Sequence, residues 1–230
     1  MGVTTVETER HVDTGSPAGT EDEKTRRTPL SVTRAKALRV AEELFRRNGV
    51  QAASVDAIAT AAGIKKMTLY RCFPVKENLV LACLQVWEAA FQAEWEQSMA
   101  RFPEEPARQL HAFFEDQAQA LSSPDAYGVV FQRLAAAYPN PEHPVRCGIR
   151  EHNALLRAKI RVLAQKAEAS DPETLTDTLC LLLAGLYTVS QTLGADSAPV
   201  RNTPNIVEKC LRQGCGAGAF PPVHRVFRRW

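Results

Sequence analysis

The first regular hydrophobic pattern along the chain begins at Thr33, after which apolar residues recur every three or four positions. Thr33 is a residue type that caps helix N-termini, and Gly49 is one that ends helices. The pattern predicts an amphipathic helix between these two residues, with an apolar face made of Ala37, Leu38, Ala41, Leu44 and Phe45.

Two shorter helical runs follow. Ser54 is a strong N-cap type and opens a run that ends at Gly63, and a further run covers Lys65 to Cys72. Pro74 cannot continue this last helix because proline lacks a backbone N–H. A helix this short is marginal alone, so we expect its neighbours to hold it through Ile64, Leu69 and Phe73.

The rest of the chain keeps the helical period, and no Val, Ile or Thr alternation between turn signals predicts a strand. We therefore predict an all-α protein of about nine helices. The six later helices are expected to begin near Leu79, after Pro106, near Asp125, near Pro144, after Asp171-Pro172 and before Ile206.

The eighth expected helix carries a regular apolar seam, spaced 4, 3, 4, 3 and 4 residues apart, beside Gly185. Two interpretations stay open from the spacing: the core of one monomer, or a dimer interface formed as a four-helix bundle with the ninth helix. The residues concerned are Leu175, Leu179, Leu182, Leu186, Val189 and Leu193, with Ile206 and Cys210 on the ninth helix.

The two ends of the chain differ from its middle. Residues 1–32 contain few large apolar side chains, and we expect them to form a disordered leader. Residues 213–230 mix Gly, Pro, aromatic and basic residues; we expect a flexible basic tail, with an accessory contact to DNA or to a partner chain as the alternative. Residues 33–78 and 79–212 are then two domains.

Charge is distributed unevenly, although the net charge is only +2. Residues 33–76 hold nine Lys and Arg against three Asp and Glu, whereas residues 77–200 hold nine against sixteen. A basic segment beside an acidic one indicates a polyanionic partner met by residues 33–76.

The six cysteines are scattered without metal-ligand spacing, and no apolar run at the N-terminus suggests a signal peptide. We expect reduced thiols in a cytoplasmic protein, no structural zinc and no membrane partner; a redox pair of Cys210 and Cys215 is the one alternative. No catalytic constellation is apparent, so we expect neither an enzyme nor a cofactor.

Three short helices with a tight Gly-containing turn between the second and third are typical of a helix-turn-helix domain. Tyr70 and Lys76 are placed to contact phosphate, and the caps Ser54 and Thr33 direct backbone N–H groups towards it. The residues expected to reach base edges are Lys65, Lys66, Met67, Thr68 and Arg71. Taken singly, a Lys-Lys pair is usually a solvated face; the combination on one basic helix-turn-helix favours DNA binding.

Residues 34–79 resemble the N-terminal domain of TetR-type transcriptional regulators. The similarity rests on Arg34, Leu38, Ala41, Leu44, Phe45, Gly49, Ser54, Val55, Ile58, Ala59, Ala62, Gly63, Ile64, Thr68, Leu69, Tyr70, Phe73, Lys76, Glu77 and Leu79. It implies a homodimer that places one recognition helix per subunit, with Arg34 among the DNA contacts, in successive major grooves of an operator, and that leaves DNA when a small ligand binds the second domain. It also favours the dimer interpretation of the seam.

The chain departs from the family pattern at Lys65, Met67 and Val75, where small or polar residues are usual. These departures bear on the operator sequence and not on the mode of binding, and we expect the protein's own choice of DNA to depend on Lys65, Lys66 and Met67.

A ligand cavity is expected among the later helices, lined by Trp95, Phe113, Phe114, Gln117, Phe131 and His152, with Tyr127, Tyr138 and Asn153 nearby. The alternative for any one aromatic is ordinary core. The sequence as a whole predicts a homodimeric repressor released from its operator by an unidentified small molecule. A helical enzyme or carrier, and a protein-recruiting helical module, are the competing hypotheses.

Overall fold

The computed structural model describes residues 1–2, 29–122 and 126–216, apart from the side chain of Tyr127, and its regular structure there is entirely helical. The all-α prediction is confirmed. The elements are α1 (Leu30–Asn48), α2 (Val55–Ala61), α3 (Lys66–Cys72), α4 (Lys76–Ala100), α5 (Pro106–Ala120), α6 (Tyr127–Ala137), α7 (Pro144–Lys166), α8 (Pro172–Leu193) and α9 (Ala198–Cys215).

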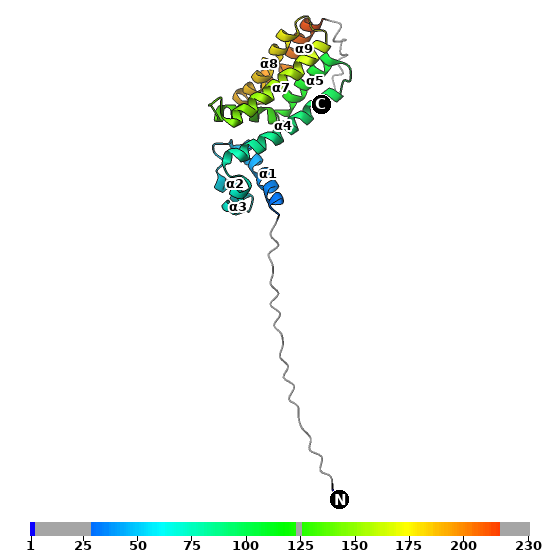
Figure 1. Cartoon of the computed structure of the whole chain (residues 1–230). Coiled ribbons are helices and arrows are strands. Elements are labelled where there is room, and N and C mark those ends of the chain that lie inside the picture. The colour runs from blue at the N-terminus through cyan, green and yellow to red at the C-terminus, as the bar shows by residue number, and fades with distance from the viewer. Residues whose placement is uncertain (3–28, 123–125, 217–230) are drawn as a thin grey trace.

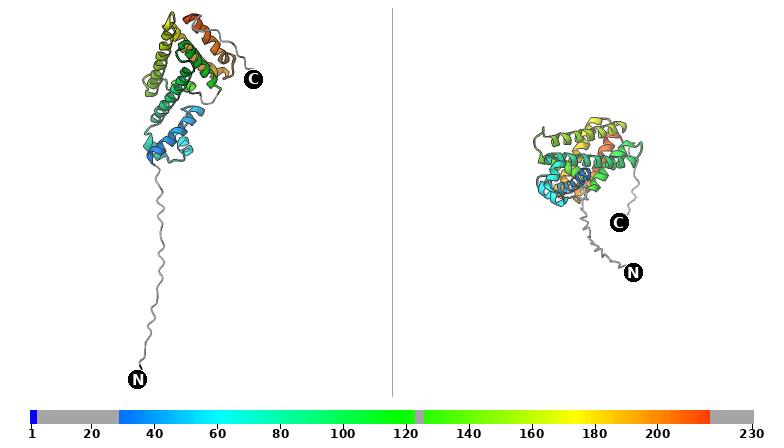
Figure 2. Two further views of the ribbon diagram at one scale, coloured as in Figure 1. Left: turned by 90° about the vertical axis from the view of Figure 1, so that its right-hand side faces the viewer. Right: turned by 60° about the horizontal axis from the view of Figure 1, so that its bottom comes forward.

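The helices form two connected groups. α1, α2 and α3 lie together at one end, and α4 runs from them into a bundle made of the remaining helices (Figures 1 and 2). Within the bundle α5 packs on α9, while α8 packs on both α7 and α9. The second domain is thus attached through a continuous helix rather than a linker.

One hydrophobic core extends through both groups because α4 contributes to each. Leu79, Val80, Cys83 and Trp87 on its first turns are almost fully buried. Burial raises the pKa of the Cys83 thiol far above its ordinary value, so this cysteine serves as a small apolar side chain.

Short-range signals place several helix boundaries as expected. The Ser54 hydroxyl accepts a hydrogen bond from the backbone N–H of Ala57 at 3.1 Å, and Asp171 accepts one from Thr174 at 3.0 Å. Gly49 ends α1 with φ 78°, a conformation in which a side chain would be strained. Pro144 and Pro172 occupy the first positions of their helices.

The start of α1 was wrongly predicted. α1 begins at Leu30 after Pro29, so Thr33 lies inside the helix, almost buried, and its hydroxyl donates back to the carbonyl of Pro29 at 3.3 Å. Thr33 is not an N-cap and directs no free N–H groups towards DNA.

At the C-terminal end of the described chain, α9 continues three residues beyond the predicted domain boundary at residue 212, to Cys215. The expected disordered leader and flexible tail fall mainly on residues outside those described.

The predicted apolar seam of α8 is divided between the interior and the surface. Leu175, Leu179 and Leu186 are buried within this chain's own core, and Leu182 and Val189 are half-buried. Only Leu193 is well exposed. The outward stripe of α8 consists instead of the exposed residues Thr174, Leu181 and Thr192, with Gly185 between them.

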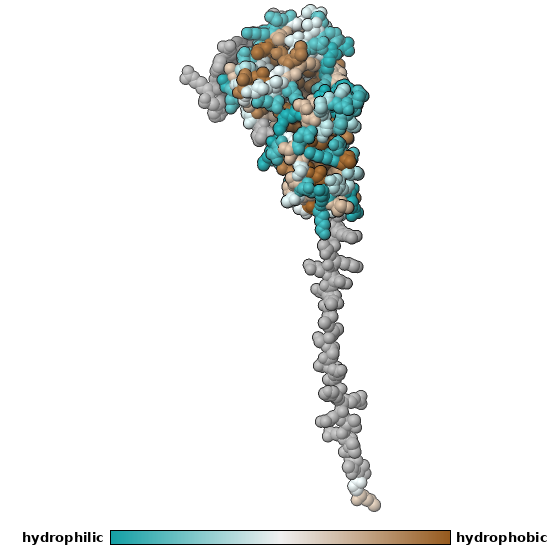
Figure 3. All heavy atoms as spheres, turned by 90° about the vertical axis from the view of Figure 1, so that its left-hand side faces the viewer, coloured by the Kyte–Doolittle hydropathy of each residue, from teal (hydrophilic) through white to brown (hydrophobic). Residues whose placement is uncertain are grey.

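The bundle surface is mostly polar, with apolar atoms gathered towards its upper end on the face seen in Figure 3. Among the described residues, no helix combines the length and apolar character that crossing a membrane requires.

The two caps proposed from sequence provide a stability test. Ser54→Ala removes a real N-cap and should lower the free energy of unfolding by about 1 kcal/mol. Thr33→Val keeps the shape of a residue within a helix and should change it by less than about 0.5 kcal/mol. Urea unfolding followed by circular dichroism measures both; an equal loss would contradict the assigned start of α1.

Candidate nucleic-acid interface and effector cavity

The turn between α2 and α3 is compact because Gly63 adopts φ 60°. Its N–H donates to the carbonyl of Thr60 at 3.0 Å, and the N–H of Ile64 donates to that of Ala59 at 3.0 Å. Leu69 and Phe73 are then buried against the other helices, which fixes the rotation of α3. The opposite side of α3 faces solvent.

Four of the predicted DNA contacts project from that outer side. Lys65, Met67, Tyr70 and Arg71 are exposed, and Thr68 is half-buried. Met67 is 73% exposed, an unusual position for a large apolar side chain in water. Such a side chain is suited to contact with a thymine methyl group in a major groove.

Lys66 is exposed but already paired. Its ammonium lies 2.9 Å from the Asp56 carboxylate of α2, and this hydrogen bond raises the pKa of Lys66. The pair links α2 to α3 on the surface. A base contact by Lys66 would require the ion pair to open.

Lys76 lies differently from the sequence prediction. Its ammonium donates to the carbonyl of Val50 at 2.5 Å and lies 6.0 Å from the ring centroid of Phe45. Partial burial lowers the pKa of Lys76. In this arrangement Lys76 holds the segment after α1 against the start of α4, and a phosphate contact by this residue stays a prediction.

Arg34 lies beside the C-terminal end of α3, and Ser54 lies at the N-terminus of α2. The Arg34 guanidinium lies 4.7 Å from the ring centroid of Phe73, so α1 reaches the end of the recognition helix. Ser54 is exposed and caps the N-terminus of α2. With Tyr70, these residues form a surface that combines basic and hydrogen-bonding groups.

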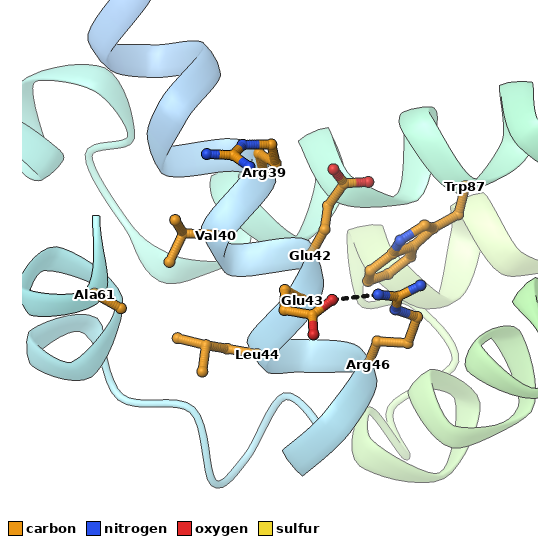
Figure 4. Close-up of a pocket in the computed structure, with 8 residues that line it drawn as sticks. All are labelled: Arg39, Val40, Glu42, Glu43, Leu44, Arg46, Ala61 and Trp87. Carbon is orange, nitrogen blue, oxygen red and sulfur yellow. Dashed lines mark hydrogen bonds and ion pairs between the residues drawn. The ribbon is translucent and has the colours of Figure 1, made fainter. Parts of the chain in front are cut away.

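A crevice of about 430 Å³ separates α1 from α2 and α4 (Figure 4). Its lining includes Arg39, Glu42, Glu43 and Arg46, and Glu43 forms an ion pair with Arg46. Burial raises the pKa of Glu42, although Arg46 opposes the shift. The crevice is therefore rich in charge and does not resemble an apolar effector site.

A second cavity, of about 220 Å³, lies among α4, α6, α7 and α8; we call it the inner cavity. It brings together Phe131, His152 and Asn153 of the predicted set. The remaining lining consists of Phe91, Gly128, Gln132, Ala135, Ile149, Leu156, Cys180, Leu183, Ala184 and Tyr187.

Of the other predicted cavity residues, those whose side chains are described do not line it, and the side chain of Tyr127 lies outside the described part. Phe113, Phe114 and Trp95 pack on one another in the core, as the alternative reading had it. Gln117 lies one shell behind the inner cavity, where its side-chain oxygen accepts a hydrogen bond from Tyr187 at 2.7 Å. Tyr138 stacks on His143 at a centroid distance of 4.5 Å.

His152 forms a hydrogen bond to a residue that the sequence analysis did not predict. Its Nδ1 lies 2.9 Å from the Glu88 carboxylate of α4, 64 positions away in sequence. Its ring stacks on Phe131 at 3.9 Å. The sequence offered no signal for this pairing, whereas Tyr187 could have been found as the only aromatic of a strongly apolar helix.

Helix α6 connects the inner cavity to the first domain. Arg133 donates to the carbonyl of Arg46 at 2.7 Å, at the C-terminal end of α1. Gln51, in the loop after α1, donates to the carbonyl of Ala137 at 3.1 Å. Since Phe131 and Gln132 of α6 line the inner cavity, one helix touches both the cavity and the helix-turn-helix domain.

The six cysteines are free in the structure, Cys210 and Cys215 included. Burial raises the pKa of both Cys180 and Cys215, which disfavours the reactive thiolate.

The sequence and the fold were compared with those of known proteins. Residues 37–83 match the model of the tetR family of bacterial regulatory proteins. The regulator QacR of Staphylococcus aureus is 36% identical over 66 residues, 29% of this chain and 35% of QacR. The regulator UidR of Escherichia coli is 31% identical over 120 residues, 50% of this chain and 57% of UidR. The chain thus spans about a third and just over a half of these relatives.

Solved structures agree over a longer stretch. A TetR-family regulator from Streptomyces coelicolor has a TM-score of 0.74 at 23% identity, covering 80% of this chain and 90% of that one. A putative regulator of the same family from Streptomyces avermitilis has a TM-score of 0.65 at 27% identity, covering 77% and 97%. Residues 37–83 therefore form a helix-turn-helix domain of the tetR family of bacterial regulatory proteins, and the described helices as a whole share the fold of TetR-family regulators.

Proposed function

We propose that the protein is a homodimeric repressor that leaves its operator when a small molecule occupies the inner cavity. The proposed ligand response rests on one observation: α6 lines the inner cavity and also contacts the end of α1. A ligand that alters the position of α6 would alter the position of the recognition helix. Its effect is limited to the difference in its affinity for the two positions.

The geometry around Arg133 supports a tight joint. The guanidinium adds positive charge where the carbonyls of α1 end, a favourable location beside the negative end of a helix. Val130 and Leu134, on the same side of α6, are buried. A shift of α6 would reach α1 chiefly through Arg133, because cavities of about 200 Å³ border the contact between the two helices.

The outward stripe of α8 supports the dimer. Leu181 is 73% exposed, and a Cβ added at the nearby Gly185 would meet open space. An exposed leucine beside a glycine allows a second helix to approach closely. Two chains joined there would supply two recognition helices, as a two-fold symmetric operator requires.

The hydroxyl of Tyr70 tests the DNA surface. Tyr70→Phe removes one hydrogen bond to phosphate and should weaken binding to the DNA flanking the gene about three- to tenfold. The loss should be similar on unrelated DNA, because phosphate carries no sequence information. Electrophoretic mobility shifts measure it, with Tyr138→Phe as control; unchanged affinity would contradict the placement of Tyr70.

Leu181 tests the dimer. Leu181→Glu places a charge on the outward stripe and should convert the protein to monomers, with operator affinity reduced more than tenfold. Sedimentation velocity measures the state. Leu155→Glu changes another well-exposed leucine, on α7, and should leave it dimeric. A dimer that survives Leu181→Glu would place the interface elsewhere.

A substitution of Arg133 tests whether this residue holds α6 to the end of α1. Arg133→Gln should raise the hydrogen exchange of residues 46–52 about tenfold, because a charged hydrogen bond to the end of α1 is lost. Arg146→Gln is the matched control, since Arg146 donates to the Ala135 carbonyl at 3.1 Å without touching the first domain. Equal exchange in the two variants would show that Arg133 does not secure α1.

A further inference from the structure

Nε2 of His152, a residue that lines the inner cavity, has no hydrogen-bond partner among the described residues. The residue is 5% exposed, and its only described side-chain partner is Glu88, on Nδ1. In the described part of the chain, Ser197 Oγ is the one side-chain polar atom that is both sealed from solvent and unpartnered. Nε2 is therefore open to a cavity.

The surroundings of the ring indicate which cavity this is. His152 separates the inner cavity from a groove of about 520 Å³ between α4 and α7. Glu88, bound to Nδ1, lines only the groove. Phe131, stacked on the ring at 3.9 Å, and Phe91, edge-on at 4.9 Å, line only the inner cavity. The ring thus reaches from the groove inwards, with Nε2 on the inner side.

The Glu88 carboxylate also decides which ring nitrogen carries the proton. A carboxylate only accepts hydrogen bonds, so Nδ1 must be the donor. Burial lowers the pKa of His152, with a further contribution from Lys159 and an opposing one from Glu88. In the neutral ring Nε2 is then a hydrogen-bond acceptor.

Tyr187 also lines the cavity, but its hydroxyl is directed to the residues behind it. Gln117 donates through its amide nitrogen to Glu94 at 3.2 Å, which leaves its oxygen to accept the Tyr187 hydroxyl at 2.7 Å. The Tyr187 oxygen keeps free lone pairs. Gln132 uses one amide N–H on the Ala184 carbonyl at 2.9 Å, and its oxygen accepts from Thr188 at 3.1 Å.

Charge and size restrict the ligand further. No Asp, Glu, Lys or Arg occurs among the described residues that line the inner cavity, so a charged ligand would lose hydration without compensation. The volume of about 220 Å³ compares with an apolar cavity of about 150 Å³ that holds benzene in another protein. There is room for one substituted ring.

We infer that the inner cavity binds a small, uncharged aromatic molecule bearing a hydroxyl or N–H group, with this donor on Nε2 of His152. The inference rests on the proposed function only in taking this cavity as the effector site. Binding itself requires neither DNA nor a dimer.

The test uses the full chain and three probes that share an ethylbenzene frame: 4-ethylphenol, which donates, 4-ethylanisole, which only accepts, and ethylbenzene, which does neither. Calorimetry should give at least tenfold tighter binding of 4-ethylphenol than of the other two, as expected when a buried acceptor is left unpaired. Equal affinities for the three, or no binding of any, would overturn the inference.

Variants identify the acceptor. His152→Phe keeps a ring between Phe131 and Phe91, so it should still bind ethylbenzene while its preference for 4-ethylphenol falls below about twofold. Glu151→Gln, in the groove, should keep the full preference. Tyr187→Phe should keep most of the preference for 4-ethylphenol. This variant also provides a test if His152→Phe does not fold, because loss of the preference in Tyr187→Phe would place the ligand's donor on Tyr187 and overturn the assignment to His152.

The proposed ligand class and the proposed release of DNA can be contradicted independently. If 4-ethylphenol binds through His152 but operator DNA is not released, the ligand class stands and the regulatory role of the cavity is wrong. If other compounds release DNA while 4-ethylphenol does not bind, the regulatory proposal stands and the ligand class is wrong.

Discussion

The structure depends on the burial of α3, a helix of seven residues that cannot persist in water on its own. Leu69 within it and Phe73 at its C-terminal end are 2% and 3% exposed, and burying each stabilises the domain by roughly 2 kcal/mol. The contacts come from α1 and α2, and α4 follows α3 directly in the chain. The rotation of α3 about its axis is fixed in this way, so Lys65, Met67 and Tyr70 face outwards together.

The supports of α3 are also the attachment to the second domain. α4 carries core residues for both groups of helices, and Lys76 at its start holds the loop after α1. On the far side of α1, Arg133 and Gln51 tie the same loop to α6. A recognition helix held by its neighbours responds to whatever moves them, and the inner cavity lies against one of these neighbours. The stability of the domain and its proposed regulation therefore have a common physical origin.

The sequence predicts those parts of the fold that short-range chemistry determines. Ser54, Gly49, Pro144 and Asp171 act within a turn of themselves, and the boundaries they predict agree with the structure. The sequence predicts an N-cap at Thr33 because threonine is a common capping residue. The helix in fact begins after Pro29, one turn earlier, so Thr33 lies inside its first turn.

Long-range pairings were beyond sequence reasoning. Glu88 and His152 are 64 positions apart, Gln117 and Tyr187 70, and Arg46 and Arg133 87. The outward stripe of α8 differs from the predicted seam for the same reason. An apolar spacing of 4 and 3 marks a helix buried along its length, but which neighbour covers each residue is decided by the packing of α6, α7 and α9 around it.

We propose that two copies of α3, presented by a symmetric dimer, read DNA. Selection of bound fragments from random DNA by the purified full chain, followed by sequencing, tests this proposal. We expect a two-fold symmetric site whose half-sites are separated by about one helical turn or a multiple of it, about 10 base pairs per turn. An enriched site without two-fold symmetry, or no enrichment at all, would contradict it.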